Sequence, residues 1–373
     1  MDSNNHKLSW KKAVNPRAVL VAVFAAALYG ISSPLSKLLL RELPPTLMAA
    51  LLYLGAGIGM LAVKWARQFR IQEQKEAKLT KQELPYVIAM VLLDIGAPIL
   101  LMSGLLLTEP ANVSLLNNFE IVATAFIALF LFKEAIGRRM WIAIGLISLS
   151  SIVLSLEGAT SLKISIGSVF ILLACCCWGF ENNCTRMLSI KDPIQIVIIK
   201  GIGSGLGALS ISLIIGQYSR HLPSILSALL VGFVAYGLSI YFYIRAQREL
   251  GAARTSAYYA TAPFIGVILS WIIFREGITI QFLIALVIML LGSYFAVSEV
   301  HDHPHAHERV THEHKHSHRD DHHTHVHNQE VIGEHSHVHT HEMVMHNHAH
   351  TPDTHHTHMH HVHTHLKQKE LDE

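Results

Sequence analysis

Residues 45–63 read PTLMAALLYLGAGIGMLAV, a run of 19 residues without a charged side chain. Residues 193–213 read PIQIVIIKGIGSGLGALSISL, in which a proline and three later glycines recur at the same spacing. About 20 apolar residues are needed to cross a bilayer as an α-helix. The two runs therefore predict two membrane spans that occupy equivalent places in a duplicated chain.

Eight further apolar runs accompany these two, so we predict an all-α membrane protein with ten transmembrane helices. Of the 373 residues, 51% are hydrophobic and only 15% are charged, which excludes an ordinary soluble protein. The runs contain no ordered nucleophile or metal motif, and we therefore do not expect an enzyme. The spans are expected at residues 18–38, 45–63, 85–106, 111–132, 140–156, 166–186, 194–216, 224–244, 255–274 and 279–298.

The two halves of the chain also match outside the glycine-rich runs. Tyr29-Gly30 followed by Lys37 corresponds to Trp178-Gly179 followed by Arg186. Each half contains five spans, an odd number, so the second half must enter the membrane from the opposite side. Inverted repeats are typical of transporters that work by alternating access around a site near the bilayer midplane. We divide the chain into an N-terminal cytoplasmic segment (1–16), a first repeat (17–157), a second repeat (166–298) and a cytoplasmic tail (299–373).

These features resemble the EamA-type transporters of the drug/metabolite transporter superfamily. The resemblance covers residues 17–298 and also rests on Phe132-Lys133-Glu134 and Phe274-Arg275-Glu276, which close the fourth and ninth spans. In that family the fourth helix of a repeat often carries a Glu-Pro step, matched here by Glu120 alone and by Pro263 alone. The resemblance implies transport of a small solute and leaves the solute open.

Basic residues are unevenly distributed between the two ends of the predicted spans. With a cytoplasmic N-terminus, the inner segments receive 18 Lys and Arg and the outer segments receive five. Lys and Arg concentrate on the cytoplasmic side of membrane proteins. We therefore expect an integral protein of the plasma (inner) membrane with both termini in the cytoplasm.

Four ionisable residues stand out within the predicted spans, where a charged side chain costs about 2.5–3.5 kcal/mol on insertion scales. Glu120 is the first candidate for proton coupling because it lies near the middle of its span, close to the polar Asn117; a buried structural acid is the alternative. Asp94 could share a proton with Glu120 or bind a cation, and a structural role fits equally well. Glu181 and Lys200 are expected to form a neutralising ion pair, with snorkelling as the alternative for Lys200.

Small side chains are concentrated in three spans. Gly55 and Gly59 have small-xxx-small spacing, as has the series from Gly201 to Gly207, and this spacing permits close helix approach. A phosphate-binding loop would need a preceding strand. We therefore predict tight packing of the second and seventh spans without nucleotide binding. All four cysteines lie between residues 175 and 184, which indicates apolar packing instead of a disulfide framework.

The tail holds 26 of the 28 histidines, many of them at every second position. Alternate residues of an extended chain share one face, and neutral imidazoles bind zinc, nickel, cobalt and copper. With few apolar residues, the tail is expected to be disordered without metal. A solvated tail whose metal affinity has no cellular role is the alternative. The predicted ligands include His301, His303, His305, His307, His312, His314, His316, His318, His335, His337, His339 and His341.

Three functional hypotheses follow from these features. The first is a proton- or ion-coupled transporter that exports a small solute, with the tail as a metal sensor, buffer or delivery arm. The second is a transporter of divalent zinc, nickel or cobalt, in which Asp94 and Glu120 receive ions gathered by the tail. The third is a membrane-anchored metal store or sensor that transports nothing. The expected partners are the lipid bilayer, a small solute, protons and transition-metal ions; a homodimer is compatible with the sequence, and nucleic acid is not expected.

Overall fold

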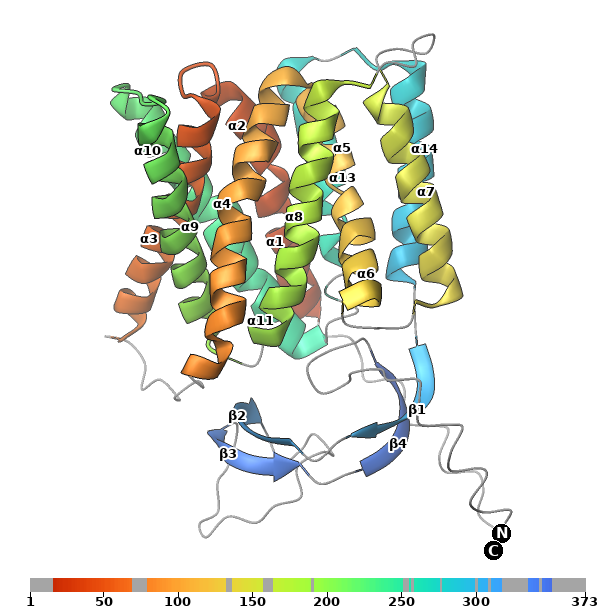
Figure 1. Cartoon of the computed structure of the whole chain (residues 1–373). Coiled ribbons are helices and arrows are strands. Elements are labelled where there is room, and N and C mark those ends of the chain that lie inside the picture. Colours follow the sequence, from red (N-terminus) through yellow and green to blue (C-terminus); the bar gives the residue numbers. More distant parts are fainter. Residues whose placement is uncertain are drawn as a thin grey trace, which may run out of the picture.

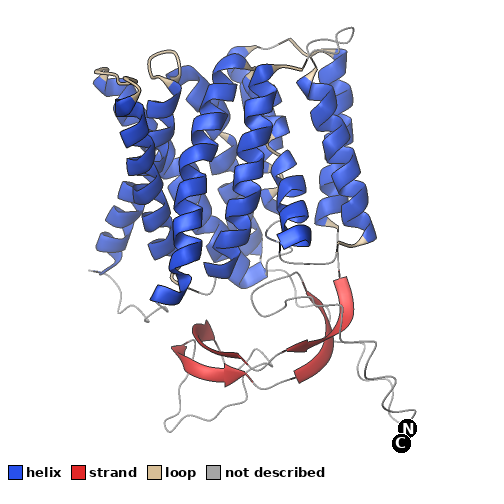
Figure 2. Cartoon of the chain, viewed as in Figure 1, coloured by secondary structure: helices blue, strands red, loops and turns tan. Residues whose placement is uncertain are grey.

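The computed structural model describes residues 16–68, 79–131, 136–156, 164–188, 191–250, 255, 258–275, 277–298, 301–307, 310–316, 335–341 and 344–350. Residues up to 298 form a helical bundle, and short paired strands lie beyond one end of it (Figures 1 and 2). The first half of the bundle comprises α1 (Pro16–Gly30), α2 (Ser32–Leu39), α3 (Pro45–Gln68), η1 (Lys81–Glu83), α4 (Leu84–Leu107), α5 (Pro110–Leu116), α6 (Phe119–Leu131) and α7 (Arg138–Ser155). The second half comprises α8 (Ile166–Leu188), α9 (Pro193–Ile214), α10 (Leu222–Val231), η2 (Gly232–Leu238), α11 (Ser239–Leu250), α13 (Ala262–Phe274) and α14 (Ile280–Val297).

Nine helical segments of the described chain are long and apolar enough to cross a bilayer, and each coincides with a predicted span. The remaining apolar helix, α13, covers only 13 residues. At 1.5 Å per residue it is about 20 Å long, which is less than the hydrocarbon thickness of about 30 Å. The predicted ninth span, residues 255–274, therefore does not appear as a continuous helix of membrane-spanning length.

Proline and capping side chains set several helix starts. α9 begins at Pro193, and the carboxylate of Asp192 accepts a hydrogen bond from the Ile194 amide at 2.9 Å. α14 follows Thr279, whose hydroxyl oxygen accepts a hydrogen bond from the Phe282 amide at 3.1 Å. Proline has no amide hydrogen that the first turn could leave without a partner. A capping side-chain oxygen accepts a hydrogen bond from one of the remaining amide groups of that turn. Short connections can therefore turn the chain sharply between spans.

Helix packing follows the pattern of two related halves. α4 and α6 of the first half pack on α8, while α11 and α13 of the second half pack on α1. α3 packs on α9 and α7 on α14, so each of these helices meets its own counterpart, and α5 packs on α13 of the span that corresponds to its own. This exchange of equivalent contacts agrees with the two-repeat architecture expected from the sequence.

Glycines bring α3 and α9 into backbone contact. A Cβ atom on Gly57 would lie 2.6 Å from the Ile202 amide nitrogen, and one on Gly201 would collide with the backbone of Gly57. Such short distances leave no room for a side chain on either helix. The predicted tight packing of the second and seventh spans is confirmed.

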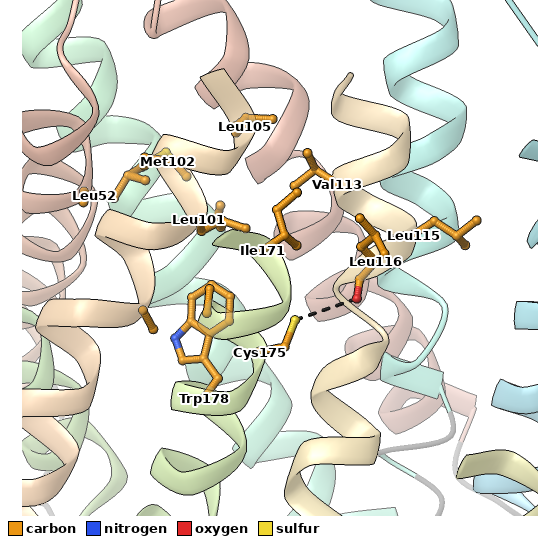
Figure 3. Packing of buried hydrophobic residues seen from close by; sticks show 14 of the residues in the cluster. Leu52, Leu101, Met102, Leu105, Val113, Leu115, Leu116, Ile171, Cys175 and Trp178 are labelled. Atoms are coloured by element: carbon orange, nitrogen blue, oxygen red, sulfur yellow. Dashed lines mark hydrogen bonds between the residues drawn. The ribbon is translucent and has the colours of Figure 1, made fainter. Parts of the chain in front are cut away.

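Apolar side chains from α3, α4, α5 and α8 meet in one buried cluster (Figure 3). Lipid chains are as apolar as leucine, so this cluster stabilises the bundle by close packing more than by the hydrophobic effect. The outer surface of the bundle carries exposed large residues, for example Phe130, Ile214 and Ile280, which are 73%, 84% and 78% exposed. Such a surface suits contact with lipid. The buried cluster includes Leu52, Leu101, Met102, Leu105, Val113, Leu115, Leu116, Ile171, Cys175 and Trp178.

Four strands follow α14, namely β1 (His301–His307), β2 (Val310–His316), β3 (His335–His341) and β4 (Val344–His350). β1 pairs with β4 and β2 with β3, both in antiparallel orientation. The prediction of a disordered tail is wrong for these four segments. Alternation of histidine with other residues has the two-residue period of a β-strand, and in these segments this local preference outweighs the low apolar content. His318 lies outside the described residues.

Candidate functional site

Lys200 of α9 lies between two carboxylates from neighbouring helices. Its Nζ atom is 3.1 Å from Oδ2 of Asp94 on α4 and 2.9 Å from Oε1 of Glu181 on α8. Asp94 is fully buried, Glu181 is 2% exposed, and the Lys200 side chain is 15% exposed. The lysine therefore points to these carboxylates, and Asp94 joins the pair that the sequence suggested. Burial of these charges is tolerable only because each lies beside an opposite charge.

Tyr53 and Trp178 extend this ionic cluster across the two halves. The Tyr53 hydroxyl donates a hydrogen bond to Oδ1 of Asp94 at 2.9 Å, and Trp178 Nε1 donates to the Tyr53 oxygen at 3.3 Å. Both aromatic residues are buried. Both oxygens of Asp94 are thus engaged, one by a cation and the other by a neutral donor.

Glu120 occupies the first turn of α6 and has a different environment. Its Oε1 atom accepts a hydrogen bond from Nδ2 of Asn182 at 2.6 Å, and the same nitrogen donates to the hydroxyl of Thr124 at 3.3 Å. Among the described contacts, the partner of Glu120 is therefore an amide, whereas Asp94 and Glu181 face an ammonium group. Glu120 can exchange a proton or contact a solute without breaking an ion pair.

The span that carries Glu120 is discontinuous. α5 ends at Leu116, a turn occupies Asn117 and Asn118, and α6 begins at Phe119. Nδ2 of Asn118 donates to the Leu115 carbonyl at 3.2 Å, and the Cys175 thiol lies 3.7 Å from the Leu116 carbonyl oxygen (Figure 3). The corresponding span of the second half also has a turn, at residues 260–261, directly before α13. Interrupted helices of this kind form substrate and ion sites in many transporters because they present backbone groups to the interior.

Asn117 contributes a polar atom at the interruption. Its Oδ1 is buried and has no hydrogen-bond partner among the described residues. A buried carbonyl oxygen without a donor costs about 1–3 kcal/mol. A solute or water with a donor group would relieve this cost, which suits the predicted role of Asn117 at the site.

α8 presents most of the network from one face. Glu181 and Asn182 follow Trp178 by three and four residues, and Thr185 follows them by four and three, so these side chains share a helix face. The Thr185 hydroxyl donates a hydrogen bond to Oε1 of Glu181. Asn182, Thr185 and Tyr53 were not among the residues predicted from the sequence. The spacing of the polar residues in an otherwise apolar span was the signal that could have revealed the first two.

A row of tyrosines leads from the ionic cluster to the interruption before α13. Ring centroids are 5.7 Å apart for Tyr53 and Tyr236, 5.9 Å for Tyr236 and Tyr29, and 5.8 Å for Tyr29 and Tyr259. Tyr236 belongs to η2, a seven-residue π-helical segment, and such segments are frequent at functional sites. The Tyr259 hydroxyl is 3.0 Å from the Ser239 hydroxyl. Tyr29 and Tyr53 belong to the first half and Tyr236 and Tyr259 to the second, so the row of rings joins the two halves.

The glycines of the two aromatic-Gly pairs, Gly30 and Gly179, allow close packing of helices. A Cβ on Gly179 would lie 2.7 Å from the Thr124 amide nitrogen in α6, and one on Gly30 would lie 2.7 Å from the Ala262 carbonyl oxygen at the start of α13. Each glycine thus lets its helix approach an interrupted span of the other half. Lys37 Nζ donates to the carbonyls of Leu105 and Thr108 at 2.6 and 2.9 Å, so it caps the end of α4.

The structure brings together four of the predicted transport residues. Glu181 and Asn182 are adjacent on α8, and they bind Lys200 and Glu120 respectively, so α8 links the two acidic centres. Within the described helices, no three His, Cys, Asp or Glu side chains form a group that could hold a metal ion. The Phe132-Lys133-Glu134 element and Glu276 lie outside the described residues.

Comparison with known proteins agrees with this architecture. The model of the EamA-like transporter family matches residues 16–156 and again residues 165–298. An "uncharacterized transporter" of Methanothermobacter thermautotrophicus is 27% identical over 291 residues, which cover 73% of this chain and 83% of that protein. The "uncharacterized inner membrane transporter YedA" of Escherichia coli (strain K12) is 25% identical over 266 residues, 67% of this chain and 83% of that protein.

A solved structure described as "Crystal structure of protein" has a similar fold. Its TM-score is 0.53 at 16% identity, and the match covers 76% of this chain and 96% of that one. The two family matches fall on the two halves of the bundle and include every residue of the buried network. The chain therefore belongs to the EamA-like transporter family and is an integral membrane transporter.

Proposed function

We propose that this transporter is a proton-coupled secondary transporter that exports a small solute by alternating access. The observation that supports this proposal most directly is the position of Asp94, Glu120, Glu181 and Lys200. All four lie where helices of the two halves meet, and Glu120 follows directly on the interruption between α5 and α6. Ionisable groups at membrane depth are costly and are typically kept for substrate or ion pathways.

Ten crossings in two inverted repeats best fit this role. α1 begins and α14 ends at the same end of the bundle, towards the strands (Figure 1), which supports an even number of crossings. In this proposal the span that ends with α13 supplies the tenth crossing, and its turn at residues 260–261 resembles the interruption between α5 and α6. The excess of basic residues on the strand side of the spans supports cytoplasmic termini.

The network separates a fixed charge cluster from an exchangeable acid. Lys200 already compensates Asp94 and Glu181, so these three groups can hold α4, α8 and α9 together. Glu120 is bound by a neutral amide and lies at the interruption, where a solute would also bind. Competition between a proton and the solute for Glu120 would couple their movements in opposite directions.

A small organic solute suits this site better than a divalent metal ion. A metal bound by Asp94 and Glu120 would have to approach the ammonium group of Lys200, 3.1 Å from Asp94. Like charges repel strongly in a medium of low dielectric constant. The amides of Asn117 and Asn182 instead offer hydrogen bonds to a polar organic group.

Proteoliposomes with a trapped pH indicator test this proposal. Amino acids, nucleosides and quaternary amines are loaded one at a time, and outward solute gradients should drive protons inward for at least one of them. Glu120→Gln should abolish the proton signal, because the amide cannot be protonated in this pH range. Zinc, nickel and cobalt gradients serve as the test of metal transport.

Glu109→Gln is the matched control for Glu120→Gln. Glu109 is exposed at the end of the same span, directly before α5. It undergoes the same chemical change without contact with the network, so its proton signal should equal that of the unaltered protein. Proton movement that persists in Glu120→Gln, or that is lost equally in Glu109→Gln, would exclude Glu120 as the coupling group.

A further inference from the structure

The register of the tail strands is specific for histidine. β1 and β4 pair His301 with His350, His303 with His348, and His305 with His346. β2 and β3 pair His312 with His339, His314 with His337, and His316 with His335. The intervening pairs in both ladders contain no histidine on either strand. A shift of one residue would place each of these histidines opposite another residue type.

This register places each set of six histidines on one face of its ladder. Directly opposed residues of an antiparallel pair lie on the same face, with Cβ atoms about 4.5–5.5 Å apart. The next residues on that face are two positions along each strand, about 7 Å away. Two neighbouring pairs therefore place four histidines on one face of the ladder, and four is the number of ligands that tetrahedral zinc requires.

The strands of the outer ladder, β1 and β4, lie far apart in the chain. Residues 308–343 lie between β1 and β4, and β2 and β3 both fall within that segment. The two ladders are thus nested, and β1 and β4 continue outward the register in which the consecutive strands β2 and β3 pair. Two-stranded ladders are marginally stable on their own in water. Bound metal is a source of free energy that can hold them together, because metal binding couples to folding.

We propose that the tail holds transition-metal ions between paired strands, one strongly bound ion in the β1–β4 ladder and one in the β2–β3 ladder. Each ion takes its imidazoles from both strands of its ladder. This differs from a series of independent sites along the chain, in which any few neighbouring histidines would serve. The inference concerns the tail alone and does not depend on which solute the helices transport.

Two variants of the full-length protein that lose the same number of histidines distinguish the two arrangements. The first replaces the six histidines of β1 and β4 (His301, His303, His305, His346, His348 and His350) by glutamine. The second replaces six histidines of β1 and β3 (His301, His303, His305, His335, His337 and His339) by glutamine. Purified proteins are loaded with Zn²⁺, treated with a competing chelator, and analysed for retained zinc by atomic emission.

If zinc binds between paired strands, the two six-residue variants should lose different amounts of zinc. The first variant destroys one ladder and should keep about half of the chelator-resistant zinc, whereas the second breaks both ladders and should keep almost none. Replacement of His301, His303 and His305 alone should lower zinc as much as the first variant does, because β4 then lacks its partner ligands. Equal zinc in the two six-residue variants, or a further loss when β4 histidines are removed after those of β1, would overturn the proposal. Gel filtration of each variant confirms that the helical bundle is intact.

Discussion

Replacing Lys200 by methionine should destabilise the bundle strongly. The Lys200 ammonium lies 3.1 Å from Asp94, which is fully buried, and 2.9 Å from Glu181, which is 2% exposed. Removal of one partner of a buried ion pair costs about 3–5 kcal/mol, because the remaining charge stays desolvated without its attraction. We therefore expect Lys200→Met to lower the free energy of unfolding by about 3–5 kcal/mol, measured by denaturant titration in mixed micelles.

Lys64→Met is the matched control for this substitution. Lys64 Nζ is 3.9 Å from Oδ2 of Asp192, and the two side chains are 32% and 20% exposed. Exposed pairs contribute about 0–1 kcal/mol, so this variant should unfold nearly as the unaltered protein does. Equal destabilisation by Lys200→Met and Lys64→Met would refute the reasoning.

A triple variant tests whether uncompensated charge causes the loss. Lys200→Met combined with Asp94→Asn and Glu181→Gln leaves no uncompensated carboxylate in the cluster. Replacement of a complete buried ion pair by neutral residues is often close to neutral in stability. The triple variant should therefore recover most of the stability lost in Lys200→Met, and a failure to recover would show that the lysine stabilises the bundle by packing alone.

Two further predictions use the same unfolding assay. Gly201→Ala should lower the free energy of unfolding by about 1–3 kcal/mol, because its Cβ would collide with the backbone of α3. Gly145→Ala is the control: the new methyl group would meet nothing within 4 Å outside its own helix backbone, so this change should be neutral or stabilising. The same sign for both variants would contradict the close approach of α3 and α9. Tyr53→Phe should cost about 1.5–3 kcal/mol through the lost hydrogen bond to Asp94, and Tyr294→Phe, at a position 67% exposed, should cost almost nothing; an unchanged Tyr53→Phe would exclude this hydrogen bond as a stabilising contact.

Asp94 illustrates how far the sequence could predict the candidate site. Its position in an apolar run marked it as exceptional, but two roles were equally consistent with that position. Its partners are Tyr53, which is 41 residues away, and Lys200 of the other half. No local pattern specifies such pairings, because they depend on which helices pack together.

For the tail, the prediction from amino-acid composition was wrong in the four strand segments. Its low apolar content led to an expectation of disorder, although the same alternation that suggested a metal-binding face also favours strands. The alternation could reveal which residues share a face, but not that His301 lies opposite His350. Strand register is a property of two segments together, so a single segment does not determine it.

Local properties were sufficient for the outline of this protein. The length of each apolar run predicted the membrane spans, the glycine spacing predicted the close packing of α3 and α9, and the matching residues of the two halves predicted a duplicated chain. Each of these patterns can be recognised without knowing which helices pack together. The interruption at Asn117, the shared bonds of Lys200 and the link from Glu181 through Asn182 to Glu120 emerged only in the folded bundle. They arise where the two halves pack together, and in a medium without water each buried polar group must find its partner on whichever helix lies beside it.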